Sequence, residues 1–444
     1  MSIREQDVLE RLSNVIDPAF QRNIVELGFV KNLEIDGSTV SFDIELTTPA
    51  CPIKDRFKSE ARAYVSQIEG VDEVEVRLTS RPQQRRPKVD NSGLAKVGSI
   101  VAIASGKGGV GKSTVAAIIA KELSQRGYAV GLLDTDIFGP SLPTLFDHHE
   151  VGLAGNSEEK ILPIEIDGLK LMSFGFWMGE NPAVMRGPMV SNYVQQFLHQ
   201  VAWGELDYLF LDLPPGTGDI QITISQSVQL DGAVIVTTPH TLSTPDVGKG
   251  MLMFDRVSVP VLGVIENMAY YQAGPEAERQ YVFGQGGADR LAARFGVEVL
   301  SQIPIDPTEF GVPFNRTIDN PVATETVDQV MRALGKFSGG VQKPTVNHDA
   351  EFITVEWPNG RMLKVRNKDL RANCQCANCV DEMTGERNLD PDTIPDDIAA
   401  EDTGVIGNYA ISVIWTDGHK TGFYPYTLLE SIAVETRDAE APVG

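Results

Sequence analysis

The chain has 444 residues, of which 42% are hydrophobic and 22% are charged, a composition typical of folded globular domains. Asp and Glu number 61 against 38 Lys and Arg, which gives a formal net charge of −23. So acidic a chain is poorly suited to coating nucleic acid or an anionic membrane, because both require a basic surface. At about 150 residues per domain, the length predicts roughly three domains.

The first twenty residues, MSIREQDVLERLSNVIDPAF, carry charges throughout and lack the apolar centre of a secretory signal. No apolar run approaches the roughly 18 residues that a transmembrane helix needs. We therefore expect a cytoplasmic protein, or one in a similarly reducing, stroma-like compartment, where thiols stay free or bind metal. We expect neither nucleic acid nor a membrane among its partners.

Two polar stretches divide the chain. Residues 81–97 and 336–350 contain Pro, Gly and polar residues without an apolar period, which is typical of solvated linkers. They delimit three predicted domains, at 1–80, 98–335 and 351–437.

The first domain is predicted to be a small α+β domain. Its apolar residues between 8 and 16 recur at helical spacing, and later segments alternate as strands do. The pair Asp36-Gly37 between two such segments is typical of a hairpin turn. The remaining predicted elements are the strands Phe29–Ile35 and Thr39–Leu46, the helix Arg56–Ile68 and the strand Val71–Leu78.

The second domain alternates short apolar runs with helical segments. Each run ends at or just before Ser, Asp, Thr or Asn, which predicts an α/β domain with a mostly parallel sheet between two layers of helices. The predicted strands are Ile100–Ala104, Ala129–Asp134, Tyr208–Asp212, Gly232–Thr237 and Val261–Glu266.

The third domain is predicted to be small, β-rich and able to bind a metal. The strands Phe352–Trp357 and Met362–Val365 precede a cysteine-rich segment, and the strand Tyr409–Trp415 follows it. Three of the chain's four cysteines stand there at C-x-C-x₂-C spacing. As thiolates they can hold a soft cation, for which a closed site needs a fourth ligand. The three are Cys374, Cys376 and Cys379.

A glycine-rich loop, GKGGVGKST at 106–114, follows the first strand of the second domain. Strand, loop, Lys-Ser pair and helix together predict a P-loop, whose backbone N–H groups cradle phosphates at a helix N-terminus. Lys112 should reach the β- and γ-phosphates of ATP, and Ser113 should bind Mg²⁺. The alternative is a glycine-rich turn without a ligand. The expected nucleotide-binding residues are Gly106, Lys107, Gly108, Gly109, Val110, Gly111, Lys112, Ser113 and Thr114.

Carboxylates follow two other strands of the same sheet. Because ligands lie at the carboxyl ends of parallel strands, Asp134, Asp136 and Asp212 should face the phosphates. We expect Asp136 to orient the attacking water, Asp134 to lie beside Mg²⁺, and Asp212 to hold Mg²⁺ through water. Alternatively, Asp134 or Asp136 caps the next element. Residues 214–218 are predicted to form a switch loop that senses the γ-phosphate.

The motifs GKGGVGKST, DTDIFGPSLP, DLPPGTGD and IENMAYY closely resemble those of the Mrp/ApbC-type iron–sulfur cluster carriers, in the MinD/ParA-like group of deviant P-loop ATPases. The resemblance covers residues 98–335. It implies that Lys107 reaches across a nucleotide-sandwich dimer, so that Lys107, Lys112 and Asp136 are the expected catalytic residues. It also implies that Asn267 hydrogen-bonds the adenine edge.

The first domain carries a second resemblance. Its segments VIDPAF, IVELGFV and TTPACP resemble the metal–sulfur-assembly domain often fused before these ATPases, which implies a functional thiol at Cys51. Because Cys51 precedes a proline in a loop that opens a helix, we expect a lowered pKa for this thiol. The alternative role is that of a small buried apolar residue.

One feature departs from the carrier pattern. Mrp-type carriers usually have a C-x-x-C pair after the ENM motif, and two such pairs bridge a cluster across a dimer. Residues 270–276 read YYQAGPE and contain no cysteine. The chloroplast high-chlorophyll-fluorescence subgroup likewise lacks the pair and has the same three-part layout, and the chain resembles that subgroup best. Cys51 is then the thiol left for handling a cluster.

The third domain resembles the N-terminal domain of gamma-butyrobetaine hydroxylase-like proteins, in which three cysteines and a later histidine bind zinc. The resemblance implies that His419 completes the site of the three cysteines, whereas His348 lies in a predicted linker. Zinc, which the resemblance favours, would be structural, and an iron–sulfur cluster would make this a cargo site. Unligated cysteines are the third alternative.

Together these features predict an ATP-dependent carrier that binds a [4Fe–4S] cluster transiently. It would receive the cluster from an upstream scaffold and transfer it to apo-proteins, while ATP hydrolysis switches a homodimer between conformations. Two other functions stay open. One is a MinD/ParA-like positioning ATPase, against which the acidic C-terminal tail counts. The other is a non-enzymatic scaffold that nucleotide and zinc stabilise.

Overall fold

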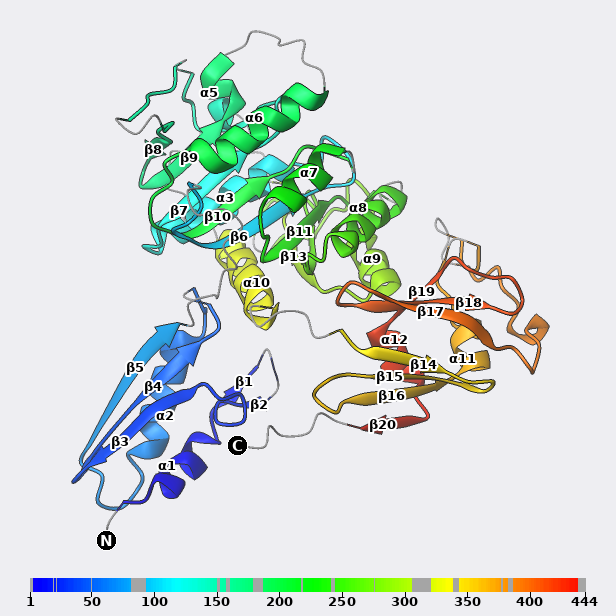
Figure 1. The fold of residues 1–444 in the computed structure, drawn as a ribbon, viewed down its shortest axis with the longest axis horizontal. Coiled ribbons are helices and arrows are strands. Elements are labelled where there is room, and N and C mark those ends of the chain that lie inside the picture. The colour runs from blue at the N-terminus through cyan, green and yellow to red at the C-terminus, as the bar shows by residue number, and fades with distance from the viewer. Residues whose placement is uncertain are drawn as a thin grey trace. The chain divides into compact units, whose positions relative to one another are not determined.

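A computed structural model gives the fold of the chain (Figure 1). It describes residues 3–437 apart from 19, 21, 49, 81–92, 150–151, 157–159, 179–186, 217–218, 241–243, 275, 306–320, 338–342, 377 and 382–385. The chain forms two compact units. One comprises residues 1–85, 328–340 and 441–444, and the other comprises residues 86–327 and 341–440.

The smaller unit is built on a three-stranded sheet. Strand β3 (Val30–Asp36) pairs antiparallel with β4 (Thr39–Leu46), which pairs parallel with β5 (Glu73–Ser80). Helix α2 (Lys54–Val65) packs on β4 and β5, and its buried residues recur at helical spacing. The other elements are α1 (Glu5–Leu12), β1 (Ile16–Asp17) and β2 (Arg22–Asn23).

The larger unit contains an eight-stranded sheet that is parallel except for its edge pair. In spatial order its strands are β13 (Val299–Gln302), β12 (Val261–Glu266), β11 (Gly232–Thr237), β6 (Val97–Ala104), β10 (Leu206–Asp212), β7 (Val130–Asp134), β9 (Leu169–Ser173) and β8 (Ile164–Ile166). Only β8 and β9 pair antiparallel. The central strands are continuous apolar runs because both faces of the sheet are buried.

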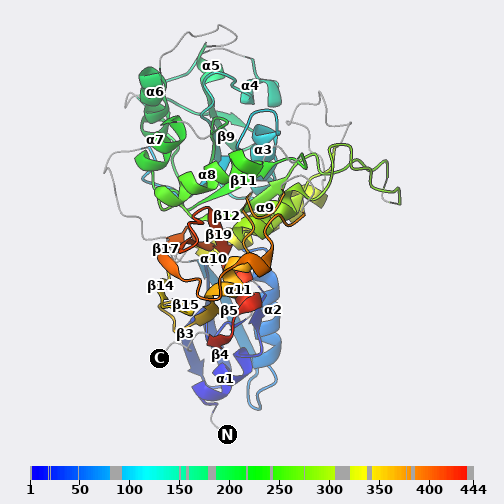
Figure 2. The ribbon, with the colours of Figure 1, turned by 90° about the vertical axis from the view of Figure 1, so that its right-hand side faces the viewer.

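Helices flank this sheet on both faces, as Figure 2 shows. Helix α3 packs against β6, β7 and β10, and so covers the centre of the sheet. The helices are α3 (Lys112–Gln125), α4 (Leu142–Leu145), α5 (Phe174–Met178), α6 (Gly187–Gln200), α7 (Asp219–Ser227), α8 (Thr244–Arg256), α9 (Gly287–Phe295) and α10 (Pro321–Phe337). Residues 321–327 of α10 belong to the larger unit, and its remaining residues are grouped with the smaller one.

The C-terminal part of the larger unit consists of two antiparallel sheets around a core of its own. That core includes all three clustered cysteines. One sheet contains β14 (Thr345–His348), β15 (Phe352–Glu356), β16 (Met362–Arg366) and β20 (Glu435–Arg437). The other contains β17 (Ala400–Ile406), β18 (Ala410–Trp415) and β19 (Gly422–Pro425). The helices are α11 (Asn367–Ala372) and α12 (Tyr426–Ile432).

Hydrogen bonds from residues 407 and 408 connect this C-terminal part to the domain of the large sheet. The Asn408 amide accepts from the backbone N–H of Val261 at 3.2 Å and donates to its carbonyl at 3.3 Å. The Asp255 carboxylate, in α8, accepts from the backbone N–H of Gly407 at 2.5 Å. Val261 begins β12, so the contact lies at the end of the sheet away from the carboxyl ends of its strands.

The predicted α/β class is confirmed, and each predicted strand of the second domain overlaps a strand of the sheet. Three boundaries were wrong. The first helix ends at Leu12, and Ile16 lies in β1. Val97, placed in a linker, begins β6, and residues 345–348 of the other predicted linker form β14. Each of these strands is stabilised by pairing with another segment, which a local pattern does not record. No helix among the described residues has the length and apolarity to cross a bilayer.

Candidate functional site

The glycine-rich loop joins β6 to α3 at the carboxyl edge of the sheet. Gly109 and Gly111 both have φ of +79°, a left-handed conformation that glycine adopts without steric cost. A Cβ on Gly111 would lie 2.2 Å from Nδ2 of Asn267, so this position also needs glycine for close packing. Lys112 then begins α3, which places the helix N-terminus at the loop, as a P-loop requires.

A cavity of about 500 Å³ opens over this loop, a volume within the usual range of small-molecule sites. Its floor is made by Ser105 and residues 107–114. Asp136, Ser141 and Pro215 complete the wall. The predicted phosphate-binding loop therefore lines a cavity together with the segment after β7.

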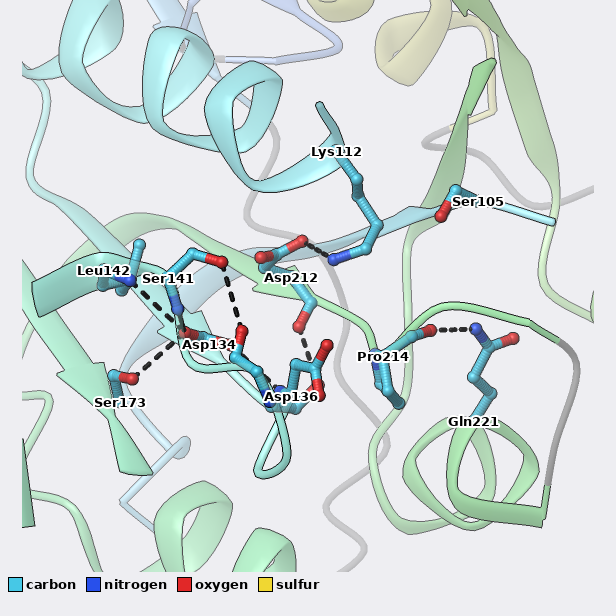
Figure 3. Close-up of polar contacts among 12 residues, drawn as sticks. Ser105, Lys112, Asp134, Asp136, Ser141, Leu142, Ser173, Asp212, Pro214 and Gln221 are labelled. Atoms are coloured by element: carbon cyan, nitrogen blue, oxygen red, sulfur yellow. Dashed lines mark hydrogen bonds and ion pairs between the residues drawn. The ribbon is translucent and has the colours of Figure 1, made fainter. Parts of the chain in front are cut away.

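Inside the site, the ammonium group of Lys112 forms an ion pair with Oδ1 of Asp212 (Figure 3). The side chains are 7% and 0% exposed. Burial raises the pKa of Asp212, and the positive charge of Lys112 lowers it in part. Among the described residues, Oδ2 of Asp212 has no hydrogen-bond partner. A buried carboxylate oxygen left unpaired in this way fits a place for a metal-bound water.

Asp134, at the end of β7, faces the loop that follows it. Its carboxylate accepts the backbone N–H of Asp136 at 3.0 Å and of Ser141 at 2.8 Å, and the hydroxyl of Ser173 at 3.0 Å (Figure 3). Burial and the nearby charge of Asp212 raise its pKa to about 7. These bonds let Asp134 hold the loop and cap the start of α4, which is the alternative role given above, and its place beside Mg²⁺ stays a prediction.

Asp136 lies on the cavity wall, and its role in orienting water stays a prediction. Its Oδ1 accepts the backbone N–H groups of Phe138 at 3.2 Å and Gly139 at 3.1 Å, which leaves the other oxygen for a ligand. Between the two aspartates, the Thr135 hydroxyl donates to the backbone carbonyl of Asp212 at 2.7 Å. The two strand ends are therefore tied together behind the cavity.

Asn267 follows β12 and is nearly buried. Its Nδ2 donates to the backbone carbonyl of Val110 at 2.9 Å, so the side chain contacts the P-loop directly. The adjacent Glu266 accepts the N–H of Ala288, at the start of α9, at 2.8 Å, and the Gln302 amide at 2.9 Å. The role of Asn267 at the adenine edge stays a prediction, and its contact with the loop was not foreseen.

Lys107 is partly exposed, and its backbone carbonyl accepts the Ser105 hydroxyl at 2.9 Å. Ser113 and Thr114 line the cavity with the rest of the loop. The reach of Lys107 into a partner subunit stays a prediction. Of the predicted switch loop at 214–218, residues 217–218 lie outside the described part of the chain.

Cys51 lies in the smaller unit, in a turn before α2, and is half-buried. Its thiol packs against the apolar core of that unit. Burial raises the pKa of Cys51 to about 11, and the hydrogen bond from the backbone of Ile53 lowers it only in part. Our expectation of a lowered pKa was therefore wrong, because desolvation of the thiolate outweighs the nearby helix N-terminus.

The four predicted metal ligands come together in the C-terminal part. The Nε2 atom of His419 lies 3.3 Å from the sulfur of Cys374, 3.6 Å from that of Cys376 and 3.9 Å from that of Cys379. All four ligand atoms lie within 4.8 Å of one another. The cysteines follow α11, and His419 lies in the turn between β18 and β19.

Hydrogen bonds around Cys376 stabilise negative charge on its sulfur, whereas burial raises the pKa of Cys379. A bond from the thiol of Cys374 lowers the pKa of Cys376 to about 4. The Thr421 hydroxyl also donates to the sulfur of Cys376, at 3.3 Å. Arg371 contacts the sulfur of Cys379 and Asp417 contacts the backbone of His419, and neither residue was predicted. Each of them lies close in sequence to a predicted ligand, and this closeness could have identified it. Asp417 stands two residues before His419, and Arg371 stands three residues before Cys374.

Family models match three parts of the chain. Residues 96–334 match the model described as NUBPL iron-transfer P-loop NTPase. Residues 5–76 match one described as iron-sulfur cluster assembly protein, and residues 345–430 match one described as gamma-butyrobetaine hydroxylase-like, N-terminal.

Individual proteins extend this likeness over almost the whole chain. The chain is 41% identical to the rice (Oryza sativa) Fe-S cluster assembly factor HCF101, chloroplastic, over 96% of its own length and 83% of that protein. It is 44% identical to the iron-sulfur cluster carrier protein of Synechocystis, over 67% of its own length and 86% of that protein. Among solved structures, a nucleotide-binding protein in complex with ADP from Archaeoglobus fulgidus is 39% identical, with a TM-score of 0.44, over 53% of this chain and 89% of that one.

Proposed function

The chain belongs to the NUBPL iron-transfer P-loop NTPase family, and on that basis we propose that it is an ATP-dependent iron–sulfur cluster carrier. It would bind a [4Fe–4S] cluster transiently, receive it from a scaffold and deliver it to apo-proteins. The observation that carries the proposal is a P-loop cavity lined by Lys112, which forms an ion pair with the buried strand-end carboxylate of Asp212.

In this proposal, each residue in or beside the cavity has a separate role in ATP hydrolysis. Lys112 and the loop N–H groups would hold the β- and γ-phosphates, and Ser113 and Asp212 would hold Mg²⁺, which neutralises the phosphate charge. Asp136, on the wall, would orient the attacking water. Lys107 would complete the site from the second subunit of a homodimer, placing a positive charge where the transition state becomes more negative.

The ion pair of Lys112 and Asp212 supplies a physical basis for a switch. In the described structure, each residue neutralises the other inside the protein. Binding of magnesium nucleotide would exchange this pair for two new ones, Lys112 with phosphate and Asp212 with the ion. The conformation with the ion pair and the conformation with the two new pairs would then bind nucleotide with different affinities. A ligand shifts a protein between two conformations only when its affinity for them differs.

A cluster on this chain needs ligands other than the usual pair of bridging thiols. The segment after Asn267 contains no cysteine, so the usual pair of bridging thiols is missing. We propose that Cys51 takes part in cluster handling, with other ligands supplied by a second subunit, small thiols or the client. Because the Cys51 thiol is protonated in the free chain, iron would have to displace its proton.

We further propose zinc at the C-terminal site. With the usual Zn–S and Zn–N bond lengths, tetrahedral coordination puts sulfur and nitrogen about 3.5 Å apart. The distances from His419 to the three sulfurs bracket that value. A four-iron cluster binds each cysteine to a different iron and needs sulfurs that are farther apart. Since the cysteines form part of the apolar core, the ion would stabilise this domain.

Anaerobic reconstitution with iron and sulfide tests the carrier proposal. The wild-type chain should gain the visible absorbance of a [4Fe–4S] cluster and pass it to an apo-protein whose activity depends on that cluster. The Cys51→Ser variant should lose most of this transfer. A variant with Cys374, Cys376 and Cys379 all replaced by Ser should keep it, because we assign those residues to zinc.

A wild-type chain that takes up no cluster would refute the carrier function and favour a scaffold. Loss of the cluster only in the triple variant would place the cargo at the C-terminal site instead. ATP turnover tests the dimer separately: Lys107→Ala should abolish hydrolysis while nucleotide binding persists, and unchanged turnover would exclude the role of Lys107 across a dimer.

A further inference from the structure

The C-terminal metal site has a second layer that joins its two ligand-bearing segments. The cysteines lie in one segment, after α11, and His419 lies some forty residues later, in the turn between β18 and β19. In the described structure, Arg371 hydrogen-bonds to both. Its Nη1 lies 3.5 Å from the sulfur of Cys379, and its Nε donates to Oδ2 of Asp417 at 2.8 Å.

Asp417 carries the connection into the histidine turn. Its second oxygen, Oδ1, accepts the backbone N–H of His419 at 2.9 Å. One carboxylate therefore orients both the guanidinium and the backbone of the histidine ligand. The side chains of Arg371 and Asp417 are 7% and 21% exposed, so this pair is shielded from solvent far more than a surface ion pair is.

Charge explains why an arginine is placed here. Three thiolates and a divalent ion sum to −1, and this charge lies in an apolar core, where an uncompensated charge is costly. The guanidinium brings a positive charge to the sulfur of Cys379. Its planar fork also meets two acceptors in fixed directions, which the compact ammonium group of a lysine does not do.

We propose that Arg371 is a positioning residue of the metal site, which retains the ion by holding the Cys379 sulfur and, through Asp417, the His419 turn in one geometry. The inference rests on the metal site proposed above and is independent of cluster transfer. It predicts that Arg371 governs how fast the metal leaves and how the sulfurs bond to it, although it is not itself a ligand.

Metal release from the full-length chain tests this role. The zinc-loaded protein is mixed with a chromogenic chelator, and the release rate is compared among wild type, Arg371→Lys, Arg371→Gln and Asp417→Asn. Loss of a residue that supports metal ligands typically costs 10–100-fold in affinity, so Arg371→Lys should release zinc about 10–100-fold faster. The matched control is Arg361→Lys, because Arg361 belongs to the same domain and pairs with Glu430 away from the ligands.

A spectroscopic readout separates positioning from general destabilisation. In the cobalt-loaded chain, loss of the Arg371 bond to Cys379 should move the thiolate-to-cobalt band to longer wavelength, because the sulfur lone pairs lose a stabilising donor. Arg361→Lys should leave the band unchanged. Retained nucleotide affinity in each variant shows that the rest of the larger unit is folded.

The outcomes distinguish the two proposals. A wild-type chain that retains no metal after purification or loading would overturn the metal site, and this inference with it. Stoichiometric zinc in wild type, together with the same release rate and the same cobalt spectrum in Arg371→Lys, would leave the metal site standing and overturn the role of Arg371.

Discussion

Lys112 and Asp212 form a buried ion pair at the centre of the phosphate site, one at the start of α3 and the other at the end of β10. Neither residue can be removed alone without leaving a buried charge unpaired, which is the costly case for buried pairs. The pair therefore contributes to the stability of the site, and we expect a nucleotide to rearrange it.

Replacing Asp212 tests the magnesium role directly. The Asp212→Asn variant should still bind nucleotide without Mg²⁺, since Lys112 is then released toward the phosphates. It should lose the tightening by Mg²⁺ and about 100-fold or more of its ATP turnover. Titration of a fluorescent nucleotide with and without Mg²⁺ measures both effects. Lys96→Ala removes an exposed pair with Glu205 and serves as the control. Undiminished stimulation by Mg²⁺ in Asp212→Asn would contradict the assignment.

Asp134 should make stability depend on pH. Its pKa is raised from 3.8 to about 7 in the folded chain, so between these values the folded state binds the proton more tightly than the unfolded state does. The contribution of this group therefore stabilises the fold at low pH and is lost as pH rises through about 7. Asp134→Asn cannot titrate there. Thermal midpoints between pH 5 and pH 8 should fall more steeply with pH in wild type than in the variant, and parallel curves would disprove this.

Cys51 should react slowly with alkylating agents. With its pKa raised to about 11, the thiolate fraction at pH 8 is roughly 100-fold smaller than for a thiol with a pKa of 9, and the thiolate is the reactive form. Mass spectrometry of iodoacetamide adducts should show slow labelling of Cys51 in the native chain and fast labelling in denaturant. Rapid labelling in the native state would show a lowered pKa after all.

Gly296 should be required where the C-terminal part meets α9. It ends that helix with φ of +69°, and a Cβ there would lie 2.5 Å from Cβ of Pro425 and 2.9 Å from the carbonyl oxygen of Tyr409. Gly296→Ala should cost about 1–3 kcal/mol more than Gly127→Ala, because Gly127 shares the left-handed backbone but has open space around it. Urea unfolding of both variants measures the difference. Equal losses would mean that backbone strain alone, without crowding, sets the cost.

Much of the phosphate site could be predicted because its signal is local. The loop at 106–114 lies between a strand and a helix within about twenty residues, and its glycines, lysine and serine are needed in that order. The roles of the carboxylates at the strand ends were harder to predict. Asp134 and Asp136 stand two residues apart, yet one holds the loop and the other lines the cavity.

Cys51 illustrates the limit of local reasoning about acidity. The neighbouring proline and helix suggested a low pKa, but the value depends on how much water reaches the thiol. That quantity is set by the apolar core of the smaller unit, whose residues come from several distant segments.

The sequence by itself determined the α/β class, the P-loop motif and the missing thiol pair, and the family resemblance pointed to the four residues that meet at the C-terminal site. These follow from residue types at short spacings, or from motifs that keep their order along the chain. Only the tertiary structure decided that Lys112 neutralises Asp212, that Arg371 and Asp417 join the cysteines to His419, and that burial raises the pKa of Cys51. Each of these depends on distance and desolvation between residues far apart in the chain, and those quantities exist only once the chain has folded.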